Sequence, residues 1–141
     1  MAARHKARKR ALDILFQSDV RSADPLDVLA EARRLRRDDG DSEFNPYVDE
    51  LVSGVVGHQG RIDDVLSTYS LGWTLERMPG VDRAILRLAT YELLWGSVPD
   101  AVVIDEAVTL ARELSTDDSP AFVNGLLARI ADQRATLDLE V

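Results

Sequence analysis

The chain has 141 residues, no cysteine, and 25 acidic against 17 basic side chains, which gives a formal net charge of −8. This length fits one domain with a sizeable core, and the lack of cysteine excludes a disulfide framework and a thiolate metal site. No apolar run approaches the length of a membrane span, so we expect a cytoplasmic protein without membrane contact.

The first predicted element is a helix that starts in the stretch RHKARKRALDILF, residues 4–16. Two stripes of side chains recur at helical spacing, on roughly opposite sides. The first stripe is apolar and holds Ala7, Ala11, Ile14 and Leu15, and the second holds His5, Lys9, Leu12 and Phe16. We therefore expect the basic block to form the first turns of a packed helix.

This block contrasts with the rest of the chain. The first ten residues carry five basic side chains and no acid, which leaves 12 basic and 25 acidic groups, a net charge of −13, in residues 11–141. Clustered cations suit a phosphate backbone, and a nearby aromatic ring can stack on an unpaired base. The candidate RNA-binding residues are Arg4, His5, Lys6, Arg8, Lys9 and Phe16. The alternative is a solvated charged face with Phe16 packed on a neighbouring helix.

The next elements are also predicted helices. Asp24 can cap a helix that has Pro25 in its first turn and that runs to about Arg37, where DDGD ends it. Asn45 followed by Pro46 repeats this start signal. We expect Gly57 and Gly60 to break that helix, so that 61–69 forms a separate one.

The second half of the chain begins with a linker at 72–80, which holds one short turn that Thr74 could cap. Helices are predicted at about 81–95, 100–114 and 119–133, because their apolar residues recur at helical spacing. The sequence thus predicts an all-α protein of about seven helices. We expect a single domain, 1–141, with two packed helical subdomains at roughly 1–72 and 73–141.

Signatures of an enzyme are missing from the sequence. The two histidines, His5 and His58, lack the spacing and thiol partners of a metal site, and no nucleophile elbow occurs. The glycine-rich stretch GVVGHQG follows a helical pattern and lacks the lysine of a phosphate-binding loop. We therefore expect no catalysis, no metal and no cofactor.

Several ordered blocks resemble the NusB family of bacterial transcription antitermination factors. They are RHKARKRALDILF, GVDRAILRLATYEL, VIDEAVTLARELS and DDSPAFVNGLLARI. The last block is the most specific, and residues 24–60 match weakly. The resemblance implies an all-α fold of two helical subdomains and an adaptor that binds single-stranded boxA RNA of ribosomal-RNA leaders. It would act with a NusE-type small-subunit ribosomal protein in the antitermination complex of RNA polymerase, and promote read-through.

The resemblance also implies further site residues. Tyr69 and Phe122 stand where the family has aromatic residues close to RNA. Glu76, Asp82 and Asp118 stand at acidic positions that resemble partner contacts. Without the resemblance, Tyr69 fits ordinary packing, Glu76 an exposed charge, and the two aspartates helix starts.

A second hypothesis involves no RNA. The chain could be an acidic protein-interaction module or a homodimer whose basic first helix contacts a protein. Salt-dependent binding of single-stranded RNA distinguishes the two hypotheses, because each phosphate contact releases counterions.

Overall fold

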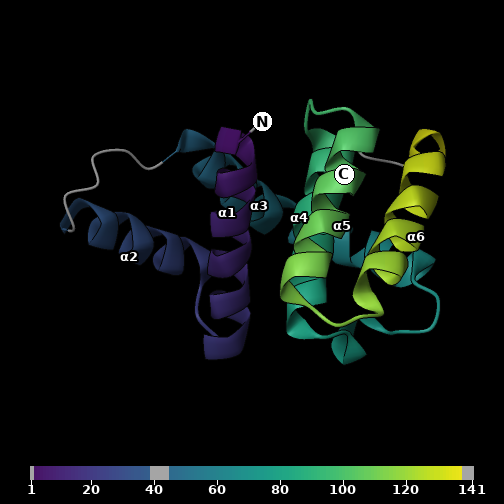
Figure 1. Ribbon diagram of the computed structural model, residues 1–141, viewed down its shortest axis with the longest axis horizontal. Helices are drawn as coiled ribbons and strands as arrows, with labels where there is room; N and C mark the ends of the chain where they lie inside the picture. The colour runs from purple at the N-terminus through teal and green to yellow at the C-terminus, as the bar shows by residue number, and fades with distance from the viewer. Residues whose placement is uncertain (1, 39–44, 138–141) are drawn as a thin grey trace.

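The computed structural model describes residues 2–38 and 45–137, and over these it contains helices and no strands (Figure 1). The all-α prediction is confirmed. The helices are α1 (Ala2–Arg21), α2 (Pro25–Asp38), α3 (Pro46–Tyr69), η1 (Leu75–Arg77), α4 (Gly80–Trp95), α5 (Asp100–Leu114), α6 (Ser119–Asp132) and η2 (Arg134–Thr136), where η marks a 3-10 helix.

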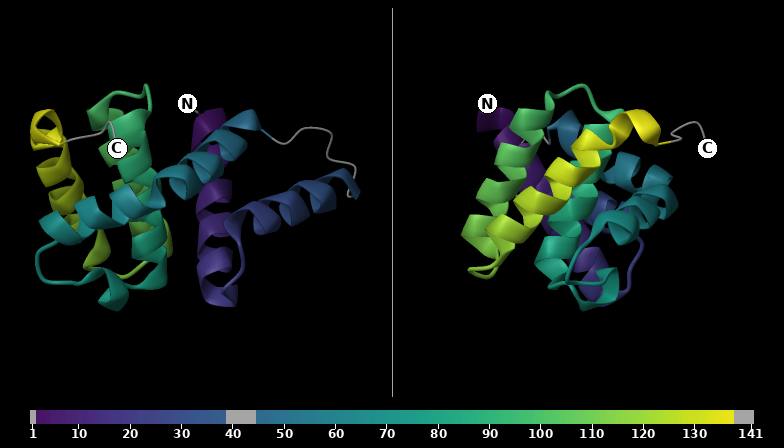
Figure 2. Two further views of the ribbon diagram at one scale, coloured as in Figure 1. Left: turned by 180° about the vertical axis from the view of Figure 1, so that it is seen from behind. Right: turned by 90° about the vertical axis from the view of Figure 1, so that its right-hand side faces the viewer.

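The helices pack around one continuous apolar core, to which all six α-helices contribute. α1 packs against α2, α3 and α4, while α4, α5 and α6 pack on one another. Seen from behind, α3 runs diagonally across the molecule, from the N-terminal end of α1 towards α6 (Figure 2). The proposed division at residue 72 stays a prediction. Within the described ranges, no helix is long and apolar enough to cross a lipid bilayer.

The predicted start signals of α2 and α3 are confirmed as N-caps. The side-chain oxygen of Asp24 accepts a hydrogen bond of 2.9 Å from the Leu26 amide, and that of Asn45 accepts one of 2.9 Å from the Tyr47 amide. Each bond satisfies an amide that the first turn of a helix leaves without a partner. Part of the predicted DDGD turn after α2 lies outside the described residues.

The predicted break at Gly57 and Gly60 is wrong, because α3 continues through both glycines to Tyr69. A Cβ atom at either position would meet nothing within 4 Å, so both glycines lie on the open side of the helix. The opposite side carries Val55, Ile62 and Leu66, all fully buried. Each glycine lowers the stability of the helix by only about 1 kcal/mol relative to alanine. The burial of apolar side chains before and after the two glycines in the sequence outweighs this cost.

Candidate nucleic-acid interface

The N-terminal turns of α1 present basic side chains to solvent. Arg4, Lys6 and Lys9 are exposed. The Arg4 guanidinium lies over the Tyr47 ring, 4.7 Å from its centroid, which is a cation–π contact. The Lys9 ammonium lies 3.6 Å from a Glu113 carboxylate oxygen, and both side chains are about half exposed. These three cations can reach a phosphate without disturbing the core.

Arg8, predicted as an RNA contact, is a core residue that is only 2% exposed, and the prediction that it contacts RNA stays untested. Its Nε and a terminal nitrogen donate to the two carboxylate oxygens of Glu92 at 2.8 and 2.9 Å. The spacing explains this placement, because Leu12 and Leu15 follow Arg8 at i+4 and i+7 and are also buried. A phosphate could reach this guanidinium only if the ion pair broke.

Tyr47 completes the environment of this ion pair. Its hydroxyl donates a hydrogen bond of 2.6 Å to Glu92. Burial, together with the hydrogen bond and charge of Glu92, raises the pKa of Tyr47 well above its usual value. Burial by itself would lower the pKa of Arg8, but the hydrogen bonds and charge of Glu92 prevail and raise it. Arg8 is therefore charged and Tyr47 neutral at physiological pH.

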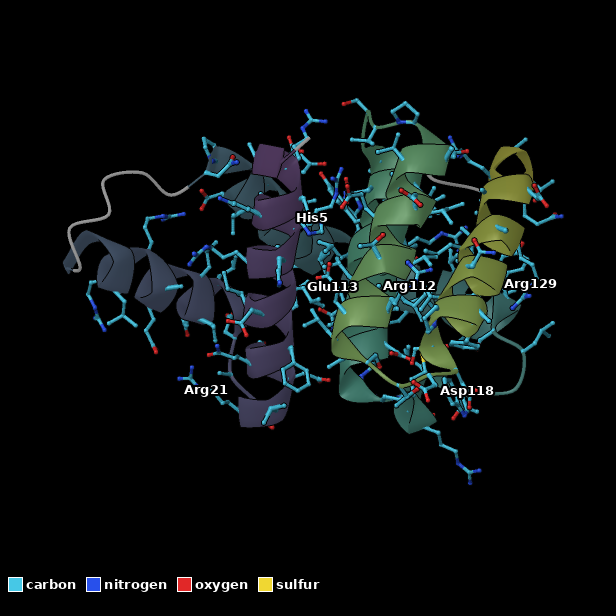
Figure 3. The ribbon with its side chains drawn as sticks, viewed as in Figure 1. His5, Arg21, Arg112, Glu113, Asp118 and Arg129 are labelled. Atoms are coloured by element: carbon cyan, nitrogen blue, oxygen red, sulfur yellow. The ribbon has the colours of Figure 1, made fainter. Side chains whose placement is uncertain are left out.

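His5 lies between α1 and α5. Its Nδ1 is 2.6 Å from a carboxylate oxygen of Glu106, and its side chain is 30% exposed. Figure 3 shows His5 on the side of α1 that faces α5, where Glu113 also lies. His5 thus joins two helices, and the prediction that it contacts RNA stays untested.

A groove of about 760 Å³ runs along α1. Its lining includes the apolar side chains of Leu12, Phe16, Val81 and Leu114 and the basic side chains of Lys6, Lys9 and Arg10. Phe16 also packs against the core, and a Cβ at Gly80 would lie 3.1 Å from its ring. The Phe16 ring is thus packed on the core and also lines the groove beside the cations, and the prediction that it contacts RNA stays untested.

The two other predicted aromatic contacts lie elsewhere. Tyr69 ends α3, and its carbonyl accepts a hydrogen bond of 3.1 Å from Arg129 of α6. Phe122 packs edge-on against Trp73, with ring centroids 4.8 Å apart. α3 begins beside α1, where Asn45 bonds the Ala3 carbonyl. At 1.5 Å per residue α3 spans roughly 36 Å, so these rings are far from the basic turns of α1.

Of the three predicted partner residues, Glu76 lies in η1, Asp82 in the first turn of α4 and Asp118 directly before α6. Glu76 and Asp118 are exposed. Asp82, predicted as a partner contact, is buried, with 0% exposure. Its two carboxylate oxygens accept hydrogen bonds from Ser115 at 2.5 Å and from Ser119 at 2.7 Å. Asp82 therefore holds α4 to α5 and α6.

Sequence reasoning did not identify four residues that contact the predicted site residues: Tyr47, Trp73, Glu92 and Glu106. Their partners lie on other helices, such as Arg8 for Glu92 and His5 for Glu106. No short-range pattern could reveal these contacts. Among the described residues, no group of three or more histidine, aspartate or glutamate side chains is placed to hold a metal ion.

Residues 5–132 match the model of the NusB family. The chain belongs to the NusB family. The match covers α1 from His5 onward and the helical core described above, so the resemblance seen in the separate blocks extends across nearly the entire chain.

Relatives confirm this membership. The chain is 59% identical over 138 residues to the transcription antitermination protein NusB of Kineococcus radiotolerans, covering 97% of this chain and 98% of the relative. It is 56% identical over 142 residues to the NusB protein of Streptomyces avermitilis, covering 99% of each.

Solved NusB structures share the fold. Thermotoga maritima NusB superposes with a TM-score of 0.79 at 35% identity, over 94% of this chain and 92% of that one. A crystal structure of the antitermination factors NusB and NusE in complex with double-stranded RNA contains a chain that superposes with a TM-score of 0.80. The identity is 26%, and 94% of this chain and 98% of that chain are covered.

Proposed function

We propose that this chain is an RNA-binding transcription antitermination adaptor of the cytoplasm that catalyses no reaction. It recognises boxA RNA of ribosomal-RNA leaders together with a NusE-type ribosomal protein, and it promotes read-through by RNA polymerase. Membership of the NusB family supports the assignment, as does the structural relative that was solved with NusE and RNA.

The observation that carries the proposal is the exposed cationic end of α1. Arg4 and Lys6 are exposed at the start of a helix whose other side is buried in the core. Lys9 and the groove below it continue this surface towards Phe16. Phosphate contacts to α1 would fix the RNA, and the apolar lining of the groove could receive a base.

The remaining site residues take separate roles in this proposal. Tyr69 and Phe122 could meet only RNA that continues along the molecule, given the length of α3. Glu76 and Asp118 are the acidic residues offered to the basic partner protein. Opposite charges across such an interface speed association and select the partner.

The test is a titration of single-stranded boxA RNA at several salt concentrations, with and without the NusE-type protein. We expect Arg4→Gln/Lys6→Gln to weaken binding and to flatten the salt slope by ~1.4, which is ~0.7 for each phosphate that the protein no longer neutralises. The matched control is Arg21→Gln/Arg34→Gln, which removes two cations away from that end of α1 (Arg21 is labelled in Figure 3).

Equal effects of the two variants would mean that only net charge matters, and that α1 is no specific RNA site. If no RNA binds at any salt concentration, even with the partner, the adaptor proposal fails. Concentration-dependent self-association without RNA binding would instead support the protein-interaction hypothesis, with the apolar lining of the groove as its contact surface.

A further inference from the structure

A buried polar cluster ties the basic end of α1 to two other helices. We call it the Arg8 cluster, and it consists of Arg8 on α1, Tyr47 on α3 and Glu92 on α4. Three hydrogen bonds of 2.6 to 2.9 Å converge on the Glu92 carboxylate. Arg8 and Glu92 are each 2% exposed, so water does not compete for these bonds.

Stability alone does not explain such a cluster. Moving two charges out of water is costly, and apolar side chains of similar size often stabilise a protein as well or better. The cluster differs from apolar packing in its directionality. A two-pronged guanidinium–carboxylate pair requires a defined orientation, and turning α1 by one residue, about 100°, would remove Arg8 from Glu92. The cluster therefore fixes the rotation of α1.

The same cluster reaches the exposed cations. The Tyr47 ring lies 4.7 Å from the Arg4 guanidinium and 5.7 Å from that of Arg8. Arg4 and Arg8 are one helical turn apart. The hydroxyl of Tyr47 is held by Glu92, so its ring forms a fixed platform for Arg4. Lys6 lies in the turn between the two arginines.

We propose that Tyr47 and Glu92 are positioning residues for RNA binding, which act through Arg8 and Arg4 to hold the basic turns of α1 in one orientation. This inference rests on the proposed function. A preformed set of cations binds with a smaller entropy cost than one that must be ordered on binding. Neither Tyr47 nor Glu92 needs to touch RNA.

The test replaces the whole cluster by apolar side chains, as Arg8→Met/Tyr47→Phe/Glu92→Met. This variant leaves no member of the cluster charged or without a partner, and it keeps a ring beneath Arg4. The matched control is Asp63→Leu/Arg87→Met, which removes another two-pronged pair, with bonds of 2.9 and 3.1 Å, that joins α3 to α4 without α1. Tyr47→Phe alone is a second, milder variant.

We expect the apolar variant to fold and to bind boxA RNA roughly 3- to 30-fold more weakly, the cost of ordering one or two long side chains. Its salt slope should equal that of the wild type, because the same phosphate contacts still form. Hydrogen exchange of the amides in the first turns of α1 should be faster, even without RNA. The control should keep wild-type affinity, and Tyr47→Phe should show a smaller decrease in affinity.

Wild-type affinity and wild-type exchange in the apolar variant would overturn the positioning role while leaving the proposed function in place. A flattened salt slope would also overturn it, because Arg8 would then be a direct phosphate contact. If the wild type itself binds no RNA, the proposed function fails, and the positioning role with it. An equal decrease in affinity in the control would show a general effect of stability and would contradict the proposal.

Discussion

Asp82 is a fully buried carboxylate, and its hydroxyl partners explain how the fold accommodates it. Ser115 and Ser119 each donate to one of its oxygens, and Ser119 lies 3.0 Å from Ser115 in the same group. A buried charge is tolerated only when it is paired or hydrogen-bonded. The group joins the start of α4 to the end of α5 and the start of α6, so the role of Asp82 is to hold these helices together.

We therefore expect Asp82→Ala to destabilise the fold by about 2–3 kcal/mol, the cost of removing hydrogen bonds to a buried charged group. Asp118→Ala should cost less than ~1 kcal/mol, because Asp118 is exposed and acts only through the helix dipole. Urea denaturation measures both values. Only Asp118→Ala should weaken partner binding without a change in stability. Similar destabilisation by the two variants would contradict the structural role of Asp82 and the surface role of Asp118.

Tyr47 makes stability depend on pH in the alkaline range. Its pKa is raised above the usual 10.0 in the folded state, by burial first and then by the Glu92 hydrogen bond. The folded state thus keeps a proton that the unfolded state loses, so this stabilisation is complete below pH 10 and declines above it. Burial also raises the pKa of Tyr91, which acts in the same direction.

The corresponding experiment compares urea denaturation of the wild type and Tyr47→Phe between pH 8 and 11. The free energy of unfolding of the wild type should fall above about pH 10. For Tyr47→Phe it should fall less steeply with pH, by a slope that corresponds to at most about one proton. Parallel curves for the two proteins would show that Tyr47 ionises at its ordinary pKa in the folded state.

At the scale of elements, α3 shows how one helix uses glycines in two different ways. Gly57 and Gly60 face open space, so their missing side chains serve no packing purpose in this chain. Gly54 lies against α4, where a Cβ would overlap the Tyr91 ring. Trp95, one turn further along α4, stacks on His58 of α3 with ring centroids 4.0 Å apart. Close approach of α3 to α4 thus depends on Gly54 alone among the three glycines.

Alanine substitutions should separate these two uses. We expect Gly57→Ala and Gly60→Ala each to stabilise the protein by about 0.5–1 kcal/mol, because alanine favours a helix and restricts the unfolded chain. Gly54→Ala should destabilise it by about 1–3 kcal/mol, since Tyr91 would have to move. Thermal denaturation of the three variants tests the signs, and a stabilising Gly54→Ala would refute the packing role.

At the scale of the whole molecule, acidic side chains surround the basic end of α1. Glu106 and Glu113 on α5 lie beside His5 and Lys9, and Glu92 neutralises Arg8. The chain as a whole has a net charge of −8. Its field opposes an approaching polyanion, so the few exposed cations act against the charge of the body. A basic partner docked on this body would reduce the opposing field.

RNA and the partner should therefore bind cooperatively. We expect a coupling of about 1–3 kcal/mol, and by reciprocity RNA should tighten the protein–protein contact by the same factor. The measurement is RNA affinity at fixed salt, with and without saturating NusE-type protein. Equal affinities in the two conditions would contradict this electrostatic mechanism, even with the fold and family unchanged.

Some features were readable from the sequence because they depend on neighbouring residues. The caps at Asp24 and Asn45 act within two residues, and the apolar stripe of α1 repeats within a few turns. Both follow from helix geometry. Local reasoning failed at Gly57 and Gly60, where the cost of glycine was visible in the sequence and the burial that outweighs it was not.

The sequence by itself determined the helical class, the position of most helices, the basic character of the first one and the family. Only the tertiary structure decided which charges face water. Arg8 and Arg4 are one turn apart in the same basic block, yet one is buried on Glu92 and the other exposed over Tyr47. Asp82 and Asp118 likewise both stand at helix starts, yet one is buried and the other exposed. The reason is physical: an ionised side chain is buried only where a partner from a distant segment offsets its desolvation, and that partner is placed by the packing of helices.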